Sequence, residues 1–175
     1  MIEQRIKAEI RDVPDFPKPG ILFKDITPIM MNAALSNDIL NHLTERYKGK
    51  GITKIAGIES RGFLFGYPLA MKLGVPFILI RKQGKLPYDK TSLSYDLEYG
   101  TSTIEMHNDA IEAGDLVLIH DDLLATGGSA TAAAQLVSNC GGTIGGFSFL
   151  VALDFLNGDE KLKGFSENIE SLVHY

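Results

Sequence analysis

The chain has 175 residues, a length typical of one domain, and its 45% hydrophobic and 22% charged residues are those of an ordinary globular protein. Its formal net charge of −5 at pH 7 argues against a general nucleic-acid or anionic-membrane surface, although a locally basic pocket could still hold a small anion. A single cysteine, Cys140, excludes an internal disulfide, and no apolar run approaches the roughly 20 residues of a membrane-spanning helix. We therefore expect a cytoplasmic protein with neither nucleic acid nor membrane as a partner.

The first part of the chain mixes helical and irregular patterns. An N-terminal helix is predicted by apolar residues at helical spacing: Ile2, Ile6, Ile10 and Val13. Several prolines and a glycine then interrupt residues 14–28, for which neither a helix nor a strand is predicted. Helical spacing returns over residues 35–47, with Ser36 or Asn37 available as the N-cap.

Three short apolar runs are typical of buried strands in a parallel sheet, at residues 54–58, 76–80 and 116–119. The interval 61–74 has the length of a crossover helix, which predicts a βαβ unit. A further helix over residues 129–140 and a strand over 143–153 continue the alternation. The expected fold class is α/β, with a central, mostly parallel sheet flanked by helices.

One polar segment, residues 82–108, breaks this alternation. It carries Gly84 and Pro87 early and a period-two pattern later, which predicts an extended hairpin or a long mobile loop. Loops of this length in a compact domain are usually functional.

Polar residues follow three of the predicted strands. Ligands of open parallel sheets bind outside the carboxyl ends of the strands, so we expect these residues to meet. They are Glu59, Ser60 and Arg61 after the first run, Arg81, Lys82 and Lys85 after the second, and Asp121 and Asp122 after the third. The basic members suggest a highly charged anionic group as part of the ligand.

The loop that follows the two aspartates, Ala125 to Ser129, has the composition of an anion site. Gly127 and Gly128 let the backbone approach an anion closely. Thr126 and Ser129 add hydroxyl donors, and the start of the next helix adds partial positive charge. The alternative is an ordinary capped turn with Ser129 as the N-cap.

Asp121 and Asp122 stand where they would repel a free anion. Carboxylates accept hydrogen bonds from sugar hydroxyls, or hold Mg²⁺ directly or through water. A ribose phosphate offers hydroxyls to the carboxylates and an anion to the loop. A ribose 5-phosphate is therefore the predicted class of ligand, and an exposed acidic strand end is the alternative.

These motifs resemble those of the type I phosphoribosyltransferase family over nearly the whole chain. The most specific is the run from Asp121 to Gly128, which is similar to the family's signature for phosphoribosyl pyrophosphate. Segments 16–21, 59–63, 81–87 and 95–100 resemble those of members that act on adenine. The resemblance implies the type I phosphoribosyltransferase fold in a single domain of residues 1–175, with a small N-terminal hood at 1–34 and a flexible catalytic hairpin at 82–108.

The reaction implied by the resemblance is purine salvage. The 5-phosphoribosyl group of 5-phosphoribosyl-1-pyrophosphate would pass to N9 of adenine, giving AMP and pyrophosphate. The residues implied for the 5′-phosphate and ribose are Asp121, Asp122, Ala125, Thr126, Gly127, Gly128 and Ser129. Those implied for pyrophosphate are Glu59, Ser60, Arg61, Arg81, Lys82 and Lys85, and the peptide between the first two is often cis in relatives. Mg²⁺ would arrive chelated by phosphoribosyl pyrophosphate, with no direct protein ligand.

The resemblance also assigns catalysis and base binding. Glu98 matches the acid/base residue that manages the proton on the purine ring. Leu22, Phe23 and Lys24 match the part of the hood that binds adenine, with the ring stacked on Phe23. A homodimer is implied, and the helix at residues 63–73 is a candidate interface. His120 interrupts a strand that is usually aliphatic, and we predict a structural role for it.

Other functions stay open from the sequence. One is phosphoribosyl transfer to another base, such as hypoxanthine, guanine or orotate, and another is a non-catalytic regulator that binds phosphoribosyl pyrophosphate. The matches at Leu22–Lys24 and Glu98 argue against the first. Intact Glu98, Lys85 and Arg61 argue against the second. A response-regulator receiver would also use strand-end aspartates, but it would not need Gly127 and Gly128.

Overall fold

The computed structural model describes residues 1–96 and 100–175 and divides the chain into two compact units, residues 1–46 and 47–175. The predicted catalytic residue, Glu98, lies outside the described residues. The assignment of a hood to residues 1–34 within a single domain stays a prediction.

The first unit contains a two-stranded antiparallel ribbon that the sequence did not predict. Its elements are α1 (Ile2–Glu9), β1 (Arg11–Pro14), β2 (Leu22–Asp25), α2 (Thr27–Met31) and most of α3 (Ala33–Tyr47). Val13 lies in β1, opposite Phe23, so its prediction as a helical residue was wrong. The expectation that residues 14–28 lack regular structure is confirmed for residues 15–21 and was wrong for the rest, because cross-strand pairing stabilises β2 and a short helix follows it. Pro28 fits in α2 because N–H groups in the first turn of a helix have no acceptor within the helix, so a proline there loses no hydrogen bond.

Helix α3 begins two residues before the predicted helix, and its cap differs. The Asn32 side chain accepts a hydrogen bond from the Leu35 N–H at 3.0 Å, which is the bond expected of an N-cap. Ser36 instead donates its hydroxyl to the Ile29 carbonyl at 2.7 Å. The prediction of Ser36 or Asn37 as the cap was therefore wrong.

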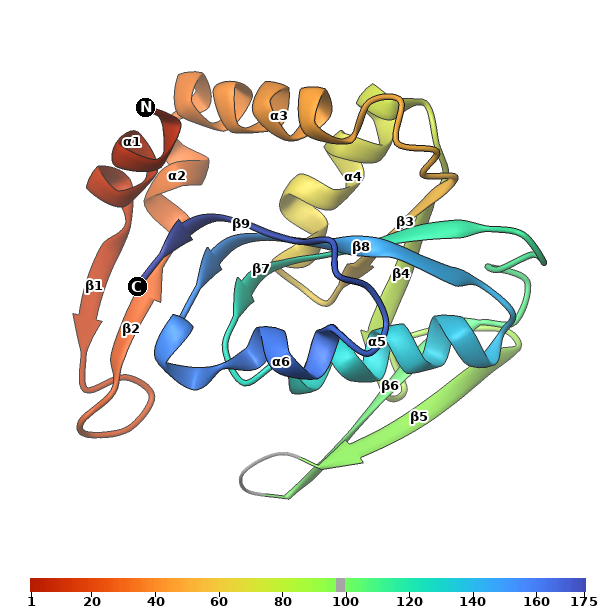
Figure 1. Ribbon diagram of the computed structural model, residues 1–175. Coiled ribbons are helices and arrows are strands. Elements are labelled where there is room, and N and C mark those ends of the chain that lie inside the picture. The colour runs from red at the N-terminus through yellow and green to blue at the C-terminus, as the bar shows by residue number, and fades with distance from the viewer. Residues whose placement is uncertain (97–99) are drawn as a thin grey trace. The chain divides into compact units, whose positions relative to one another are not determined.

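The described residues of the second unit form a seven-stranded sheet in the order β5-β6-β4-β3-β7-β8-β9 (Figure 1). The strands are β3 (Lys54–Ile58), β4 (Phe77–Lys82), β5 (Lys90–Asp96), β6 (Thr101–His107), β7 (Leu116–Leu124), β8 (Thr143–Ala152) and β9 (Ile169–His174). Strands β4, β3, β7, β8 and β9 are parallel, whereas β5 and β6 form an antiparallel hairpin beside β4. The predicted mostly parallel sheet and the predicted hairpin are both confirmed.

Helices cover both faces of this sheet. Figure 1 shows α4 (Gly62–Leu73) on one face, and α5 (Gly128–Asn139) and α6 (Gly158–Leu162) on the other. The chain runs outward from β3 to β4 and, in the opposite direction, from β7 to β8. The carboxyl ends of β3 and β7 therefore border the topological switch point, where α/β sheets bind ligands.

Strand β7 is longer than its apolar run suggested. The prediction ended it at Ile119, but pairing with β8 continues to Leu124, which lies opposite Ala152. Asp121 and Asp122 are thus strand residues, and the backbone holds them in fixed positions. The strand continues through two carboxylates because it stays paired with β8 as far as Leu124, so its backbone N–H and C=O groups keep their partners.

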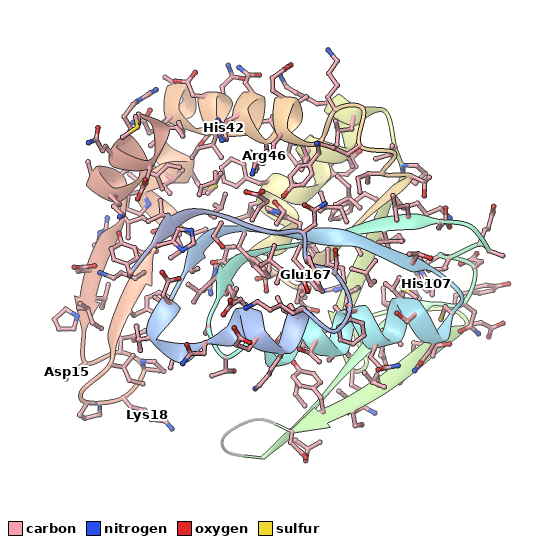
Figure 2. The ribbon with its side chains drawn as sticks, in the orientation of Figure 1. Asp15, Lys18, His42, Arg46, His107 and Glu167 are labelled. Atoms are coloured by element: carbon pink, nitrogen blue, oxygen red, sulfur yellow. The ribbon has the colours of Figure 1, made fainter. Side chains whose placement is uncertain are left out.

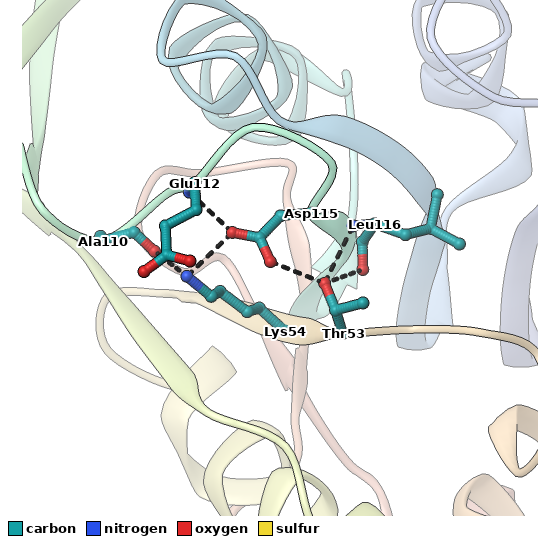
Figure 3. Close-up of polar contacts among 6 residues, drawn as sticks. All are labelled: Thr53, Lys54, Ala110, Glu112, Asp115 and Leu116. Carbon is teal, nitrogen blue, oxygen red and sulfur yellow. Dashed lines mark hydrogen bonds and ion pairs between the residues drawn. The ribbon is translucent and has the colours of Figure 1, made fainter.

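A polar network joins β3 to β7 at their amino ends, away from the switch point (Figure 3). Lys54 Nζ lies 2.8 Å from Asp115 Oδ2, and Thr53 donates its hydroxyl to Asp115 Oδ1 at 2.9 Å. The hydrogen bond from Lys54 holds the pKa of the Asp115 carboxyl below its ordinary value, and the Glu112 N–H adds to this effect. The network fixes the register of the two central strands.

Among the described helices, none combines the length and the apolar character needed to cross a lipid bilayer.

Candidate active site

A cavity of about 330 Å³ opens at the carboxyl ends of β3, β4 and β7. It is lined by residues from all three strand ends: Ile58, Glu59, Ser60, Arg61, Lys82, Asp121, Asp122 and Ser129. Among the described residues that the sequence assigns to the same ligand, Arg81, Lys85 and the loop 125–128 are not part of this lining. The expectation that the strand-end residues converge is therefore met for the carboxylates, Arg61, Lys82 and Ser129.

The segment after β3 is tied to β4 through Glu59. The Glu59 carboxylate accepts hydrogen bonds from the Lys82 N–H at 2.9 Å and from Arg81 Nε at 3.1 Å. Partial burial opposes ionisation, but these donors hold the pKa of Glu59 below its ordinary value. The Glu59–Ser60 peptide is cis. Arg81 therefore neutralises a protein carboxylate, and its guanidinium also donates to the Lys85 carbonyl at 3.2 Å.

Arg61 reaches across the cavity to β7. Its Nε donates to Asp122 Oδ2 at 2.6 Å, and the Asp122 side chain is only 6% exposed. Gly62, the first residue of α4, makes this approach possible, because a Cβ there would lie 2.7 Å from the His120 carbonyl oxygen. The cation and carboxylate that the sequence assigns to pyrophosphate and to ribose are thus bonded to each other.

Asp121 has a second kind of environment. Burial, followed by the charge of Asp122, raises the pKa of the Asp121 carboxyl well above its ordinary value. Its Oδ1 accepts the Asp122 N–H at 2.8 Å. Hydroxyl donors on a ligand would favour the ionised form of Asp121, so this carboxylate is suited to binding a sugar.

We expect Asp121→Asn to increase stability and to weaken ligand binding. A carboxyl group with a raised pKa in the folded protein stabilises the fold at pH values below its unfolded pKa, and this stability is lost as the pH rises through the folded pKa. The ionised Asp121 carboxylate therefore destabilises the folded wild type at neutral pH. Asparagine keeps the acceptor for the Asp122 N–H and removes the charge. Thermal unfolding at pH 7 should show a higher Tm, and calorimetry should show weaker binding of ribose 5-phosphate. An unchanged affinity would contradict the assignment of Asp121 to the sugar.

The loop between β7 and α5 presents backbone N–H groups rather than a side-chain cap. Gly127 is the N-cap residue with φ of 76°, and no side chain caps the helix. Ser129 lies inside α5, so the alternative of an ordinary turn with Ser129 as the N-cap was wrong. The first turn of α5 also carries no acidic residue. These features suit an anion at the start of the helix.

Two residues at this loop were missed by the sequence analysis. Gly158, at the start of α6, lies so close that a Cβ there would be 2.2 Å from the Ala125 carbonyl oxygen. Tyr95 of β5 places its hydroxyl 3.0 Å from Ser129 Oγ. The period-two pattern of β5 could have put Tyr95 on the same face as Leu93, but it carries no information about the partner.

His120 lies in β7 directly before Asp121 and is fully buried. Its Nδ1 lies 3.1 Å from Ser148 Oγ, and its Nε2 has no hydrogen-bond partner among the described residues. Burial disfavours the imidazolium and lowers the pKa of His120 to about 4. A neutral, buried ring that packs beside α4 supports the predicted structural role.

His120 should make the protein sensitive to acid. Because the pKa of His120 is lower in the folded than in the unfolded protein, its neutral form stabilises the fold above pH 6.5, and this stability is lost as the pH falls toward 4. The loss in the free energy of unfolding between pH 7 and 4.5 is about 2–3 kcal/mol. Urea unfolding of His120→Gln should therefore show a smaller loss over this interval, by about that amount. The exposed His42 supplies the control, and His42→Gln should retain the wild-type loss. An equal loss of stability in the wild type and both variants would show that His120 is not the source of the acid sensitivity.

The residues predicted to bind adenine belong to the first unit. Leu22, Phe23 and Lys24 lie in β2, and the Phe23 ring meets the Phe16 ring edge-on at a centroid distance of 5.1 Å. Lys24 Nζ lies 2.6 Å from Asp12 Oδ1 on β1. Figure 2 shows Asp15 and Lys18 in the loop that joins the two strands, where Asp15 Oδ1 accepts the Gly20 N–H at 2.7 Å. The ribbon is thus well ordered by its own contacts, and adenine binding stays a prediction.

Comparison with known proteins gives concordant results. The family described as "Phosphoribosyl transferase domain" matches residues 24–154. A protein of Cytophaga hutchinsonii named adenine phosphoribosyltransferase is 49% identical over 175 residues, which cover 100% of this chain and 97% of the relative. The crystal structure of adenine phosphoribosyltransferase from Thermoanaerobacter pseudethanolicus is 47% identical, covers 100% of both chains and gives a TM-score of 0.95. The Saccharomyces cerevisiae enzyme, solved with an imino-altritol bisphosphate and adenine, is 41% identical with a TM-score of 0.90 and 98% of both chains covered.

Proposed function

Because the chain belongs to the phosphoribosyltransferase family, we propose that it transfers the phosphoribosyl group of phosphoribosyl pyrophosphate to N9 of adenine, giving AMP and pyrophosphate in purine salvage. The observation that carries this function is the composition of the cavity at the switch point. Its lining brings together the carboxylates of β7, the two cations Arg61 and Lys82, and the Ser129 hydroxyl at the start of α5, around one space of about 330 Å³. A sugar that is phosphorylated at one end and carries a diphosphate at the other matches all three groups.

The ribose 5-phosphate end belongs at β7 and α5. Asp121 and Asp122 accept hydrogen bonds from the 2′- and 3′-hydroxyls, and the loop from Ala125 to Ser129 binds the 5′-phosphate. Support comes from the uncapped start of α5 and from the acceptors fixed within β7. A strand backbone holds carboxylates more firmly than a loop does, which preorganises the sugar site.

The pyrophosphate end belongs at the β3 and β4 ends. Ser60, Arg61 and Lys82 face the cavity, and Arg61 would exchange its bond with Asp122 for the oxygens of the diphosphate or share it with them. Glu59 and Arg81 neutralise each other, so we assign them to positioning the Lys82 backbone rather than to direct charge neutralisation. Lys85 stays a predicted contact.

The chemistry is substitution at C1′. The bond from C1′ to the pyrophosphate oxygen breaks, N9 of adenine forms the new bond, and C1′ passes through an oxocarbenium-like state. Arg61 and Lys82 stabilise the charge that develops on the leaving group. Glu98 manages the proton on the purine ring, and the hairpin of β5 and β6 excludes water from the reactive intermediate. Phe23 stacks on adenine, while Leu22 and Lys24 contact its edge.

In this scheme, Mg²⁺ enters the site chelated by phosphoribosyl pyrophosphate. Among the described residues, no group of three or more His, Cys, Asp or Glu side chains is arranged to hold a metal ion. Asp121 and Asp122 supply carboxylate oxygens, which suit Mg²⁺ contacts made through water. When bound, the ion neutralises diphosphate charge.

A homodimer is the proposed assembly. The outer side of α4 exposes apolar side chains at helical spacing, with Leu64 at 46%, Tyr67 at 54% and Met71 at 65% exposure. Such a stripe is typical of a contact between protein surfaces. Light scattering should give twice the 19.1 kDa of one chain, and a Tyr67→Glu, Met71→Glu variant should shift the mass toward one chain. A wild type that stays at the mass of one chain would contradict the proposal.

An activity assay tests the reaction itself. Purified protein is incubated with Mg²⁺, phosphoribosyl pyrophosphate and each of adenine, hypoxanthine, guanine and orotate in turn. AMP should form from adenine, with far lower product formation from the other bases. Product from another base alone would establish the alternative transferase, and binding of phosphoribosyl pyrophosphate without product would establish a regulator.

A further inference from the structure

Tyr95 connects the hairpin of β5 and β6 to the first turn of α5. Its hydroxyl oxygen lies 3.0 Å from Ser129 Oγ. Its ring lies 3.9 Å from the position that a Cβ on Gly128 would occupy, so it packs across the start of the helix. Leu93, two residues earlier in β5, packs with Tyr95 against the hydrophobic core. The ring and the hydroxyl of Tyr95 are thus both in contact with the predicted phosphate loop.

The direction of this hydrogen bond depends on what the loop holds. Each hydroxyl can donate or accept, so either direction is possible in the free protein. The oxygens of a phosphate dianion only accept hydrogen bonds. A phosphate at the start of α5 therefore accepts a hydrogen bond from the Ser129 hydroxyl. Ser129 has no second proton to donate, so its Oγ can then only accept the hydrogen bond from Tyr95. Hydrogen bonds in series polarise one another, so each strengthens the other.

We propose that Tyr95 is a positioning residue, which aims the Ser129 hydroxyl at the 5′-phosphate and transmits phosphate binding to β5. The inference rests on the proposed function, because it requires a ribose 5-phosphate at this loop. Coupling of this kind is reciprocal, so order in β5 also strengthens phosphate binding.

The topology explains why such a link matters. Within the sheet β5 borders β6, and β6 pairs with β4 over the short register from Arg81 opposite Glu105 to Lys82 opposite Ile104. The bond from Tyr95 to Ser129 adds a hydrogen bond that joins the hairpin directly to the phosphate loop. Tyr95 precedes Glu98, the proposed acid/base residue, by three residues in the sequence.

Tyr95→Phe tests the hydroxyl while it keeps the ring over Gly128. By calorimetry, the variant should bind ribose 5-phosphate about fivefold to tenfold more weakly than the wild type, the loss expected for one hydrogen bond. Tyr88→Phe is the matched control, because Tyr88 is 76% exposed and should be replaceable without effect. In a Ser129→Ala background, Tyr95→Phe should cause no further loss, since the partner of the hydroxyl is already gone.

Hydrogen exchange supplies a readout that a purely structural role would not change. Ribose 5-phosphate should increase the protection of the β5 amides in the wild type and in Tyr88→Phe, and should leave it nearly unchanged in Tyr95→Phe. The Tm of each variant without ligand, compared with that of the wild type, shows whether the substitution destabilises the whole fold. In kinetics, Tyr95→Phe should raise the KM for phosphoribosyl pyrophosphate and also lower kcat.

The possible outcomes separate the two proposals. A wild type that neither binds ribose 5-phosphate nor forms AMP overturns the proposed function and this inference together. Wild-type binding with equal affinity in Tyr95→Phe overturns the role of Tyr95 alone. A loss that is the same in the wild-type and Ser129→Ala backgrounds also overturns it, because the effect would then not pass through Ser129.

Discussion

Replacement of Glu98 by leucine is expected to lower kcat by about 10²–10⁴-fold, the range associated with loss of a general acid or base. Leucine keeps a comparable volume and removes the group that would exchange a proton with the purine ring. AMP should still bind with nearly wild-type affinity, because the proposed phosphate and ribose contacts are at β7 and α5, away from Glu98 in the sequence. Single-turnover measurements with phosphoribosyl pyrophosphate and adenine would separate the chemical step from product release.

Asp96 provides the control for Glu98. It is an exposed carboxylate at the end of β5, two residues earlier in the chain. Asp96→Leu makes the same chemical change at nearly the same place and should alter kcat by less than about threefold, as expected of a surface position. If both variants lost activity equally, the effect would belong to the hairpin rather than to an acid/base group.

Gly127→Ala is expected to damage both the fold and the phosphate site. Gly127 has φ of 76°, and a Cβ there would lie 2.5 Å from the Gly158 carbonyl oxygen. The left-handed conformation costs a non-glycine residue about 1–2 kcal/mol, and moving the Gly158 backbone adds to this cost. We therefore expect the free energy of unfolding to fall by about 3 kcal/mol. A displaced loop would no longer aim its N–H groups at the proposed phosphate, which should weaken ribose 5-phosphate binding by about 10²-fold or more.

Two other glycines make the test of Gly127 specific. A Cβ on Gly128 would meet its nearest neighbours at 3.9 Å, and a Cβ on Gly164 would meet nothing within 4 Å. Gly164→Ala should therefore retain both stability and affinity. Gly128→Ala should retain stability and change affinity only as far as its methyl group approaches the phosphate. Denaturant unfolding and calorimetry measure the two effects, and a stable Gly127→Ala variant would contradict the steric argument.

The parallel sheet could be predicted because its strands carry a strong local signal. The apolar run at residues 54–58 coincides with β3, since a strand buried on both faces needs apolar residues throughout. The helix predicted for residues 129–140 differs from α5 by one residue at each end. Local periodicity is sufficient wherever a whole element packs into the core.

The other elements depend on partners that are distant in the sequence. Strand β7 continues through Asp121 and Asp122 because β8 pairs with it, and β2 forms because β1 lies opposite. The prolines between residues 14 and 28 suggested an irregular chain, and cross-strand bonds outweighed them. Nothing was predicted for β9 or α6, whose short segments carry little periodicity.

The site was predicted as a set of residues but not as a set of contacts. The sequence placed Arg61 and Asp122 at neighbouring strand ends, yet their hydrogen bond joins positions 61 residues apart. The Arg81 side chain pairs with Glu59 instead of lining the cavity. Its direction depends on side-chain conformation, which the periodicity of the sequence does not predict. The bond between Tyr95 and Ser129 crosses from the hairpin to α5 and is likewise tertiary.

The network of Thr53, Lys54 and Asp115 has a consequence for engineering this protein. It secures the central strands at their amino ends, whereas the ligand cavity lies at their carboxyl ends. Stabilising substitutions made around that network would not touch the catalytic machinery, so they could offset the cost of active-site changes introduced to accept a different base. Directed evolution of base specificity should therefore progress further from a parent that has first been strengthened at the opposite edge of the sheet.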